Sequence, residues 1–301
     1  MSTSTAIADS QPSALARARD FVELCKPRIA TLVLFVVIAS GFVATFGQAD
    51  PLQLLNVSIG AVLVAASASA SNHWLEQHRD ARMRRTQQRP LVAGRISQWE
   101  ALTFITVTLI AGIAYLIFTV GITSTIAGAL TWILYVLIYT PLKIVSPTNT
   151  AVGAVAGAMP VIIGWGATGA DLDWRCWALF LTLFLWQFPH FMAIAWIYRE
   201  QYGRAGMKML TVVDPSGVRA GIQSILAAIA VIPVSVLPLL STPTPWAVAG
   251  VAVVAILGLI QLALAMWFAW RRDEISARTL MRGTLIYLPL VLLVVVVFPL
   301  L

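Results

Sequence analysis

Three side chains with oxygen ligands recur every four residues near the end of the second apolar segment of the chain. They are Asn72, Glu76 and Asp80. On a helix, residues four apart stack on one face, so an amide and two carboxylates would converge at one helix end. Mg²⁺ usually takes one or two protein carboxylates and completes its octahedron with water and substrate phosphate. The spacing therefore fits a Mg²⁺ site that also receives a phosphate group.

Arginines follow these oxygen ligands directly. Arg82, Arg85 and Arg89 lie within the next nine positions, and their planar, permanently charged guanidinium groups suit phosphate oxygens. An ordinary polar helix end with arginines at the membrane interface fits the same pattern equally well. This stretch alone leaves both interpretations open.

A second polar cluster follows the sixth apolar segment. It combines the carboxylate of Glu200 with the cations Arg199, Arg204 and Lys208, and a third polar stretch, Tyr139 to Lys143, adds a lysine at the end of the fourth segment. Whether these clusters can meet depends on the elements that carry them.

Those elements are predicted to be membrane-spanning helices. Of the 301 residues, 59% are hydrophobic and 11% are charged, whereas a soluble domain carries roughly 25% charged residues. The apolar runs are continuous, as in helices that cross the roughly 30 Å hydrocarbon core. We therefore expect an all-α polytopic membrane protein with nine spans, at about 28–47, 53–75, 100–120, 122–140, 150–169, 176–197, 219–240, 246–268 and 282–301.

The basic residues indicate how these spans are oriented. With nine spans, nineteen of the twenty Lys and Arg residues fall on one side, and only Arg175 falls on the other. Because cytoplasmic loops carry the excess of Lys and Arg, the N-terminus is predicted inside and the C-terminus outside. The net charge of +7 is then explained by topology, and we expect no nucleic-acid partner. The polar clusters share the cytoplasmic side, which favours a metal–diphosphate site.

Taken together, the motifs resemble the UbiA-type intramembrane prenyltransferases, and within them the branch that farnesylates protoheme IX. The likeness runs from about residue 22 to 300. It is carried by Lys26-Pro27-Arg28, by Asn72, Glu76 and Asp80 with Met83-Arg84-Arg85-Thr86 and Arg89-Pro90-Leu91, by Tyr139-Thr140-Pro141-Leu142-Lys143 with Asn149, and by Pro189-His190-Phe191 leading to Tyr202, Ala205-Gly206 and Met209-Leu210.

The resemblance implies nine helices around a central cavity, in a single intramembrane domain at 22–301 after a mobile cytoplasmic tail at 1–21. It implies a multi-pass protein of the plasma (inner) membrane that uses Mg²⁺, with farnesyl diphosphate, protoheme IX and the lipid bilayer as partners and heme A synthase as a candidate protein partner. The implied catalytic residues and metal ligands are Asn72, Glu76, Asp80 and Glu200. The implied substrate-binding residues are Arg28, Arg85, Arg89, Lys143, Arg204, Lys208, Tyr139, Tyr202 and His190.

The chain departs from the family pattern at two positions. Glu76 stands where many members have Asp, and Gln201 stands where relatives usually have Asp, which leaves Glu200 as the carboxylate of the second cluster. His190 lies beside a helix-kinking proline and is predicted either to contact heme or to form a hydrogen bond between helices. Two alternatives to the farnesyl transfer are another prenyl acceptor, such as an aromatic acid or quinone precursor, and a transporter. The acids lie at span ends and no convincing internal duplication is visible, which disfavours a transporter.

Overall fold

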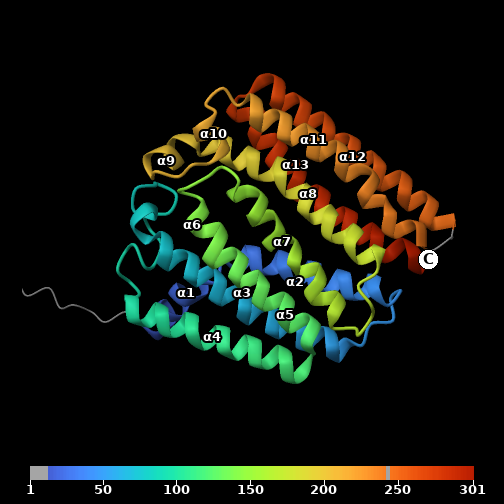
Figure 1. The fold of residues 1–301 in the computed structure, drawn as a ribbon, viewed down its shortest axis with the longest axis horizontal. Helices are drawn as coiled ribbons and strands as arrows, with labels where there is room; N and C mark the ends of the chain where they lie inside the picture. The colour runs from blue at the N-terminus through green and yellow to red at the C-terminus, as the bar shows by residue number, and fades with distance from the viewer. Residues whose placement is uncertain (1–12, 242–244) are drawn as a thin grey trace, which may run out of the picture.

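The computed structural model describes residues 13–241 and 245–301, and within these ranges the regular structure is entirely helical (Figure 1). Nine of the described helices or helix runs are long and apolar enough to cross a membrane. They are α2 (Pro27–Ala44), α3 (Pro51–Asp80), α4 (Gln98–Thr119), the run Ile122–Leu142, α7 (Asn149–Gly166), α8 (Trp174–Ile197), the run Val218–Ser241, α12 (Pro245–Arg271) and α13 (Glu274–Val297). The predicted all-α, nine-span fold class is confirmed.

Two of the nine spans change helix type along their length. The fourth consists of α5 (Ile122–Trp132), a π-helix η1 (Ile133–Tyr139) and α6 (Thr140–Leu142), and the seventh consists of α11 (Val218–Val236) followed by the 3₁₀-helix η2 (Leu237–Ser241). Short helices connect or precede the spans: α1 (Ala14–Leu24), α9 (Arg199–Arg204), α10 (Leu210–Val213) and the 3₁₀-helix η3 (Phe298–Leu300).

Helix α7 lies among α2, α5 and α8 and is buried along most of its length. Its sequence is rich in Gly and Ala, and small residues allow helix backbones to approach closely. At Gly164 an added Cβ would lie 2.0 Å from the backbone oxygen of Val37 on α2. Close contact between α2 and α7 therefore requires glycine at this position.

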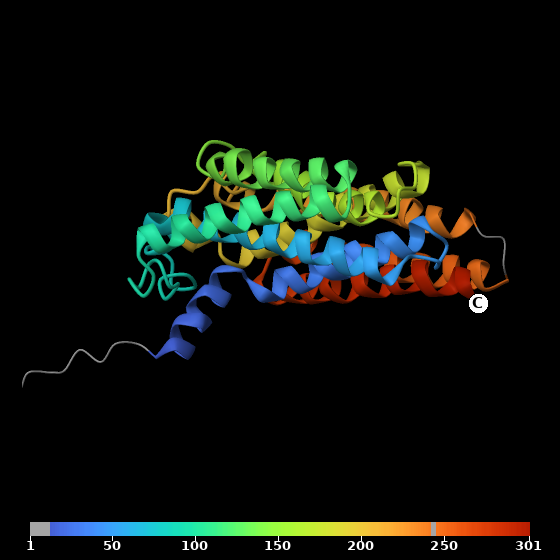
Figure 2. The same cartoon turned by 90° about the horizontal axis from the view of Figure 1, so that it is seen from below.

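Helices α9 and α10 and the connection after α3 lie at one end of the bundle, and the C-terminus lies at the other (Figure 1). Helix α1 projects away from this end of the bundle (Figure 2). The side chain of Arg95 holds it there by ion pairs with Asp20 (2.7 Å) and Glu23 (3.2 Å). This end carries Asn72, Glu76 and Asp80, so we call it the carboxylate end.

Three boundaries in the structure differ from those that we expected. Residues 1–12 of the predicted tail lie outside the described residues, but Ala14–Leu24 form a helix whose N-cap is Ser13. Helix α3 continues through the polar residues to Asp80. The last span begins at Glu274 instead of 282, because the side chain of Asp273 accepts a hydrogen bond from the backbone N–H of Ser276 and caps the helix before its apolar part.

Candidate active site

The three oxygen ligands lie on one buried face of α3. Asn72, Glu76 and Asp80 are 2%, 5% and 1% exposed, respectively. The four-residue spacing therefore produces the convergence that we predicted, in the last three turns of a 30-residue helix. Buried carboxylates are costly unless they are paired with cations or metal ions, so the surroundings of this face decide what it can do.

Each of the three ligands is paired with a different cation. The Nζ atom of Lys26 donates to Oδ1 of Asn72 at 2.7 Å, and Nζ of Lys143 donates to Oε1 of Glu76 at 2.7 Å. These cations come from segments far apart in sequence.

Arg89 and Asp80 form the third pair between an oxygen ligand and a cation. A guanidinium nitrogen of Arg89, from the connection after α3, donates to Oδ2 of Asp80 at 2.5 Å, while Oδ1 of Asp80 is buried and has no hydrogen-bond partner among the described residues. The site thus contains two carboxylates, one amide and three cations.

Local backbone conformation brings the two lysines to this face. Lys26 has the left-handed φ of 49° as it precedes Pro27, the first residue of α2. The following proline disfavours the right-handed helical conformation at Lys26, and with its left-handed φ the Lys26 side chain reaches Asn72 on α3. The site requires this conformation of a non-glycine residue, a type of backbone strain that is common at functional sites.

Lys143 is positioned by the π-helix. In η1 the wider turns end at Thr140, whose hydroxyl donates to the backbone oxygen of Tyr135 and accepts from the amide of Asn72. Lys143 follows one turn later and lies over the ring of Tyr139, 4.5 Å from its centroid. Single π-helical turns often occur at functional sites. This π-helix sets the rotation of the end of the fourth span, so that Lys143 faces the ligand face of α3.

Electrostatics distinguish the two lysines. Burial, together with the positive charges of Arg89 and Lys143, lowers the pKa of Lys26 to about 7. Burial alone would lower the pKa of Lys143 as well, but the carboxylate of Glu76 outweighs it, and the pKa of Lys143 is raised. Lys143 is therefore a firmly held cation, and Lys26 loses its proton more easily than an ordinary lysine.

Arg85 connects the two polar clusters at the carboxylate end. Its backbone N–H donates to Oε1 of Gln201 at 3.3 Å, and its guanidinium donates to the hydroxyl of Tyr202 at 3.3 Å. The guanidinium also lies 4.7 Å from the ring centroid of Tyr198, within cation–π range. Gln201, at the position where the family usually has Asp, thus holds the connection after α3 against α9.

Four predicted site residues stay apart from the ligand face. Glu200, Arg28, Arg204 and Lys208 are exposed, and their side chains form no ion pair or hydrogen bond within the described residues. Nor does this part of the chain contain a group of three or more His, Cys, Asp or Glu side chains that could hold a metal, so Glu200 does not join Glu76 and Asp80. Helix α9 presents Glu200 to the outside, while Gln201 and Tyr202 contact Arg85. A role for Glu200 in holding a metal ion stays a prediction.

Lys208 nevertheless contributes through its backbone. Its N–H donates to the carbonyl oxygen of Lys143 at 2.6 Å, and its own carbonyl accepts from the Asn149 amide at 3.3 Å. The segment before α10 therefore supports the segment that carries Lys143.

The structure gives His190 the contact between helices that one of our two interpretations predicted. Its Nδ1 lies 2.9 Å from the hydroxyl oxygen of Thr284 on α13, and its ring stacks on Trp186 with centroids 5.2 Å apart. A contact between His190 and heme stays a prediction.

Lys26 is the site residue that we missed in the sequence. We noted its motif, Lys26-Pro27-Arg28, but assigned substrate binding to Arg28. The X-Pro step signalled an irregular backbone next to this lysine, but the left-handed φ that aims it at α3 is visible only in the structure.

The donor set fits Mg²⁺. Two carboxylates and an amide, with one buried Asp80 oxygen that has no partner among the described residues, match the few protein oxygens that Mg²⁺ takes when phosphate and water supply the rest. The central cavity that we expected stays a prediction, since the cavity of about 510 Å³ in this structure lies at the opposite end of the bundle.

Solved structures of known proteins share this helical architecture. A solved structure of digeranylgeranylglyceryl phosphate synthase superposes with a TM-score of 0.75 at 19% identity, over 94% of this chain and 98% of that one. A structure of a UbiA homolog from Archaeoglobus fulgidus bound to GPP and Mg²⁺ superposes with a TM-score of 0.70 at 16% identity, over 92% and 99%.

Sequence comparison is more specific. The profile of the UbiA prenyltransferase family matches residues 32–297, and this chain belongs to that family. A relative named protoheme IX farnesyltransferase from Solibacter usitatus is 40% identical over 91% of this chain and 96% of its own length. One of the same name from Rhodopirellula baltica is 38% identical over 91% and 97%.

Proposed function

We propose that this chain transfers the farnesyl group of farnesyl diphosphate to a vinyl group of protoheme IX, giving heme O and diphosphate. The observation that carries the proposal is the near-complete overlap with relatives named protoheme IX farnesyltransferase. The ligand face of α3 adds what such a reaction needs, namely a buried place for a diphosphate with cations around it.

Departure of the diphosphate is the first chemical step. The bond between C1 of the farnesyl group and the diphosphate oxygen breaks, and its electron pair leaves with the diphosphate. Lys26, Lys143 and Arg89 then stabilise the developing negative charge in a site sheltered from water, where such interactions are strong. Arg85, whose guanidinium is partly exposed beside Tyr202, extends this positive region toward the solvent.

The second step forms the carbon–carbon bond. The electron-rich vinyl carbon attacks C1 of the allylic cation, and the positive charge moves to the neighbouring carbon beside the porphyrin. Water adds to that carbon and releases a proton, which yields the hydroxyethylfarnesyl side chain. Tyr139, packed beside Lys143, is our candidate for contact with the prenyl group.

Mg²⁺ would be held by Asn72, Glu76 and Asp80, as their donor atoms suggest. Bound there, it would neutralise diphosphate charge as a Lewis acid. The same residues now bind Lys26, Lys143 and Arg89. These cations are therefore already beside the place where the diphosphate would bind.

The acceptor would approach from α8 and α13. His190 is held by Thr284 through one ring nitrogen, which would fix its orientation toward a heme iron or propionate, as outer partners commonly do for ligating histidines. We place the chain in the plasma membrane with the carboxylate end in the cytoplasm, because the basic residues concentrate there. Heme A synthase is the partner proposed to receive the product.

Expression in a host that makes no heme O tests the proposal. Pigments extracted from membranes that contain this chain should include heme O when they are separated and identified by mass spectrometry. Asp80→Asn, produced to the same level, is the matched control. Absence of heme O together with no consumption of labelled farnesyl diphosphate would refute the assignment.

A further inference from the structure

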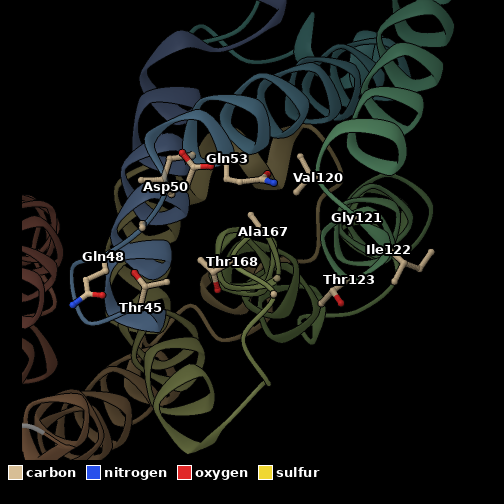
Figure 3. A pocket seen from close by; sticks show the side chains of 14 residues that line it. Thr45, Gln48, Asp50, Gln53, Val120, Gly121, Ile122, Thr123, Ala167 and Thr168 are labelled. Atoms are coloured by element: carbon tan, nitrogen blue, oxygen red, sulfur yellow. The ribbon is translucent and has the colours of Figure 1, made fainter.

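A polar cavity lies at the end of the bundle opposite the carboxylate end. Its volume is about 510 Å³, in the range typical of ligand sites. The end of α2, the start of α3, the connection between α4 and α5, and the end of α7 form its walls (Figure 3). This cavity takes no part in the proposed reaction.

The length of α3 gives the distance between the cavity and the ligand face. Gln53 lines the cavity and Asp80 ends the same helix. At 1.5 Å per residue they are roughly 40 Å apart. A bilayer with its headgroups is about 40–45 Å thick. The cavity therefore lies at the level of the lipid headgroups, in the leaflet away from the carboxylates.

The cavity lining offers hydrogen-bond acceptors and one negative charge. Asp50 is the only charged residue among the fourteen that line it. One oxygen of Asp50 caps α3 by accepting from the N–H of Leu52 at 2.9 Å, and a carboxylate has room for further donors. Oε1 of Gln53 is buried and has no hydrogen-bond partner among the described residues. In Figure 3 the Gln53 side chain extends from α3 toward Val120.

Two threonines add to this acceptor surface. The hydroxyl of Thr45 already donates to the Gly41 carbonyl, and that of Thr168 donates to the Trp165 carbonyl. Since their protons are committed, their remaining capacity is to accept, and Thr168 already accepts from the N–H of Ala170. The absence of Lys, Arg and His from the lining makes the cavity unsuitable for a diphosphate or for porphyrin propionates. It calls for a ligand with several donors and a positive charge.

Exposed apolar side chains lie close in sequence to the lining residues. Leu52 and Phe118 are 63% and 86% exposed, each within two positions of a lining residue, and Ile122, which is 60% exposed, itself lines the cavity. A ligand bound here has hydrocarbon beside it and polar acceptors beneath it, which matches an amphiphile of the bilayer.

From this we infer that the cavity binds the primary ammonium headgroup of an ethanolamine phospholipid from that leaflet. The –NH₃⁺ group would donate to Asp50 and to the buried oxygen of Gln53, and the acyl chains would lie along the exposed apolar residues. A choline headgroup has the same charge but no N–H, so it cannot make these hydrogen bonds. The site should therefore prefer ethanolamine over choline lipids.

The test is lipid binding to the detergent-purified full chain, followed by native mass spectrometry. The probes are phosphatidylethanolamine and phosphatidylcholine with identical acyl chains. Wild type should bind the ethanolamine lipid about tenfold more tightly, equivalent to about 1.4 kcal/mol, and Asp50→Asn with Gln53→Met should remove that preference. Asparagine still caps a helix, so α3 should remain folded, and Asp50→Asn alone should lose part of the preference.

Asp171→Asn is the control, because it removes an exposed carboxylate at the same end outside the cavity. It should bind as wild type does. Free ethanolamine at millimolar concentration should not displace the lipid. Equal binding of the two lipids, a preference that survives the double substitution, an equal loss in Asp171→Asn, or displacement by free ethanolamine would each overturn the inference. None of these outcomes depends on farnesyl transfer.

Discussion

The ion pair between Lys143 and Glu76 allows a quantitative prediction. Its atoms are 2.7 Å apart, and the side chains are only 12% and 6% exposed. At an effective dielectric constant of 20, Coulomb's law gives an attraction of about 6 kcal/mol, part of which offsets the cost of burying the two charges. Removing one partner of a buried pair typically costs about 3–5 kcal/mol. We therefore expect Lys143→Met to lower the free energy of unfolding by about that amount.

The double substitution separates the charge from the packing. In Lys143→Met with Glu76→Gln neither charge remains, so the loss should be clearly smaller than the sum of the two single losses. Arg278→Met is the control: it removes a four-residue-spaced pair with Glu274 whose side chains are 45% and 60% exposed, and such a pair contributes about 0.3–0.5 kcal/mol.

Reversible unfolding of the purified protein in mixed micelles, followed by tryptophan fluorescence, gives the required free energies. The reasoning fails if Lys143→Met costs no more than Arg278→Met. It also fails if the Lys143 and Glu76 effects add, because the two groups would then act independently.

Three further predictions concern the site and the packing behind it. Asp80→Asn should abolish prenyl transfer while the protein still inserts into the membrane. EDTA should abolish the activity of the wild type until Mg²⁺ is restored. Transfer of labelled farnesyl groups in the variant, or in the presence of EDTA, would remove the metal assignment. Lys26→Met should raise KM for farnesyl diphosphate at least about tenfold, as expected for a lost charged contact, whereas Arg28→Met should leave it near the wild-type value; equal effects would contradict the assignment of Lys26. Gly164→Ala should lower the free energy of unfolding by about 1–3 kcal/mol through overpacking against α2. Gly203→Ala is the control and should be tolerated, because its added Cβ would meet only a side chain at 3.8 Å. Equal shifts of the thermal unfolding temperature in the two variants would contradict the close packing of α7 on α2.

The ligand face of α3 could be predicted from the sequence because its information is local. A repeat of four residues fixes a helix face wherever the helix lies, and Asn72, Glu76 and Asp80 needed no knowledge of the fold. The nine spans were likewise predictable, since each apolar segment has to satisfy its own backbone in the membrane.

The partners of that face could not be predicted in the same way. Lys143 reaches Glu76 from 67 positions away, through a π-helix that the apolar pattern of 133–139 does not distinguish from an α-helix. Glu200 and Gln201 are neighbours in sequence, yet only Gln201 contacts the connection after α3. Which of two adjacent residues faces inward depends on how α9 docks, and this is a tertiary property.

The pairing of each ligand with its own cation has a consequence for biogenesis. The chain enters the membrane from its N-terminus, and α3 arrives with two carboxylates at its end. Lys26 precedes them, Arg89 follows nine residues after Asp80, and Lys143 completes the set only at the end of the fourth span. A nascent chain therefore neutralises its own acidic face once four helices have been made, without the last five. Any fragment that stops before Lys143 leaves Glu76 without its cation. A partly synthesised chain of that length, with an unpaired carboxylate in its helix bundle, would be the insertion intermediate most exposed to cellular quality control.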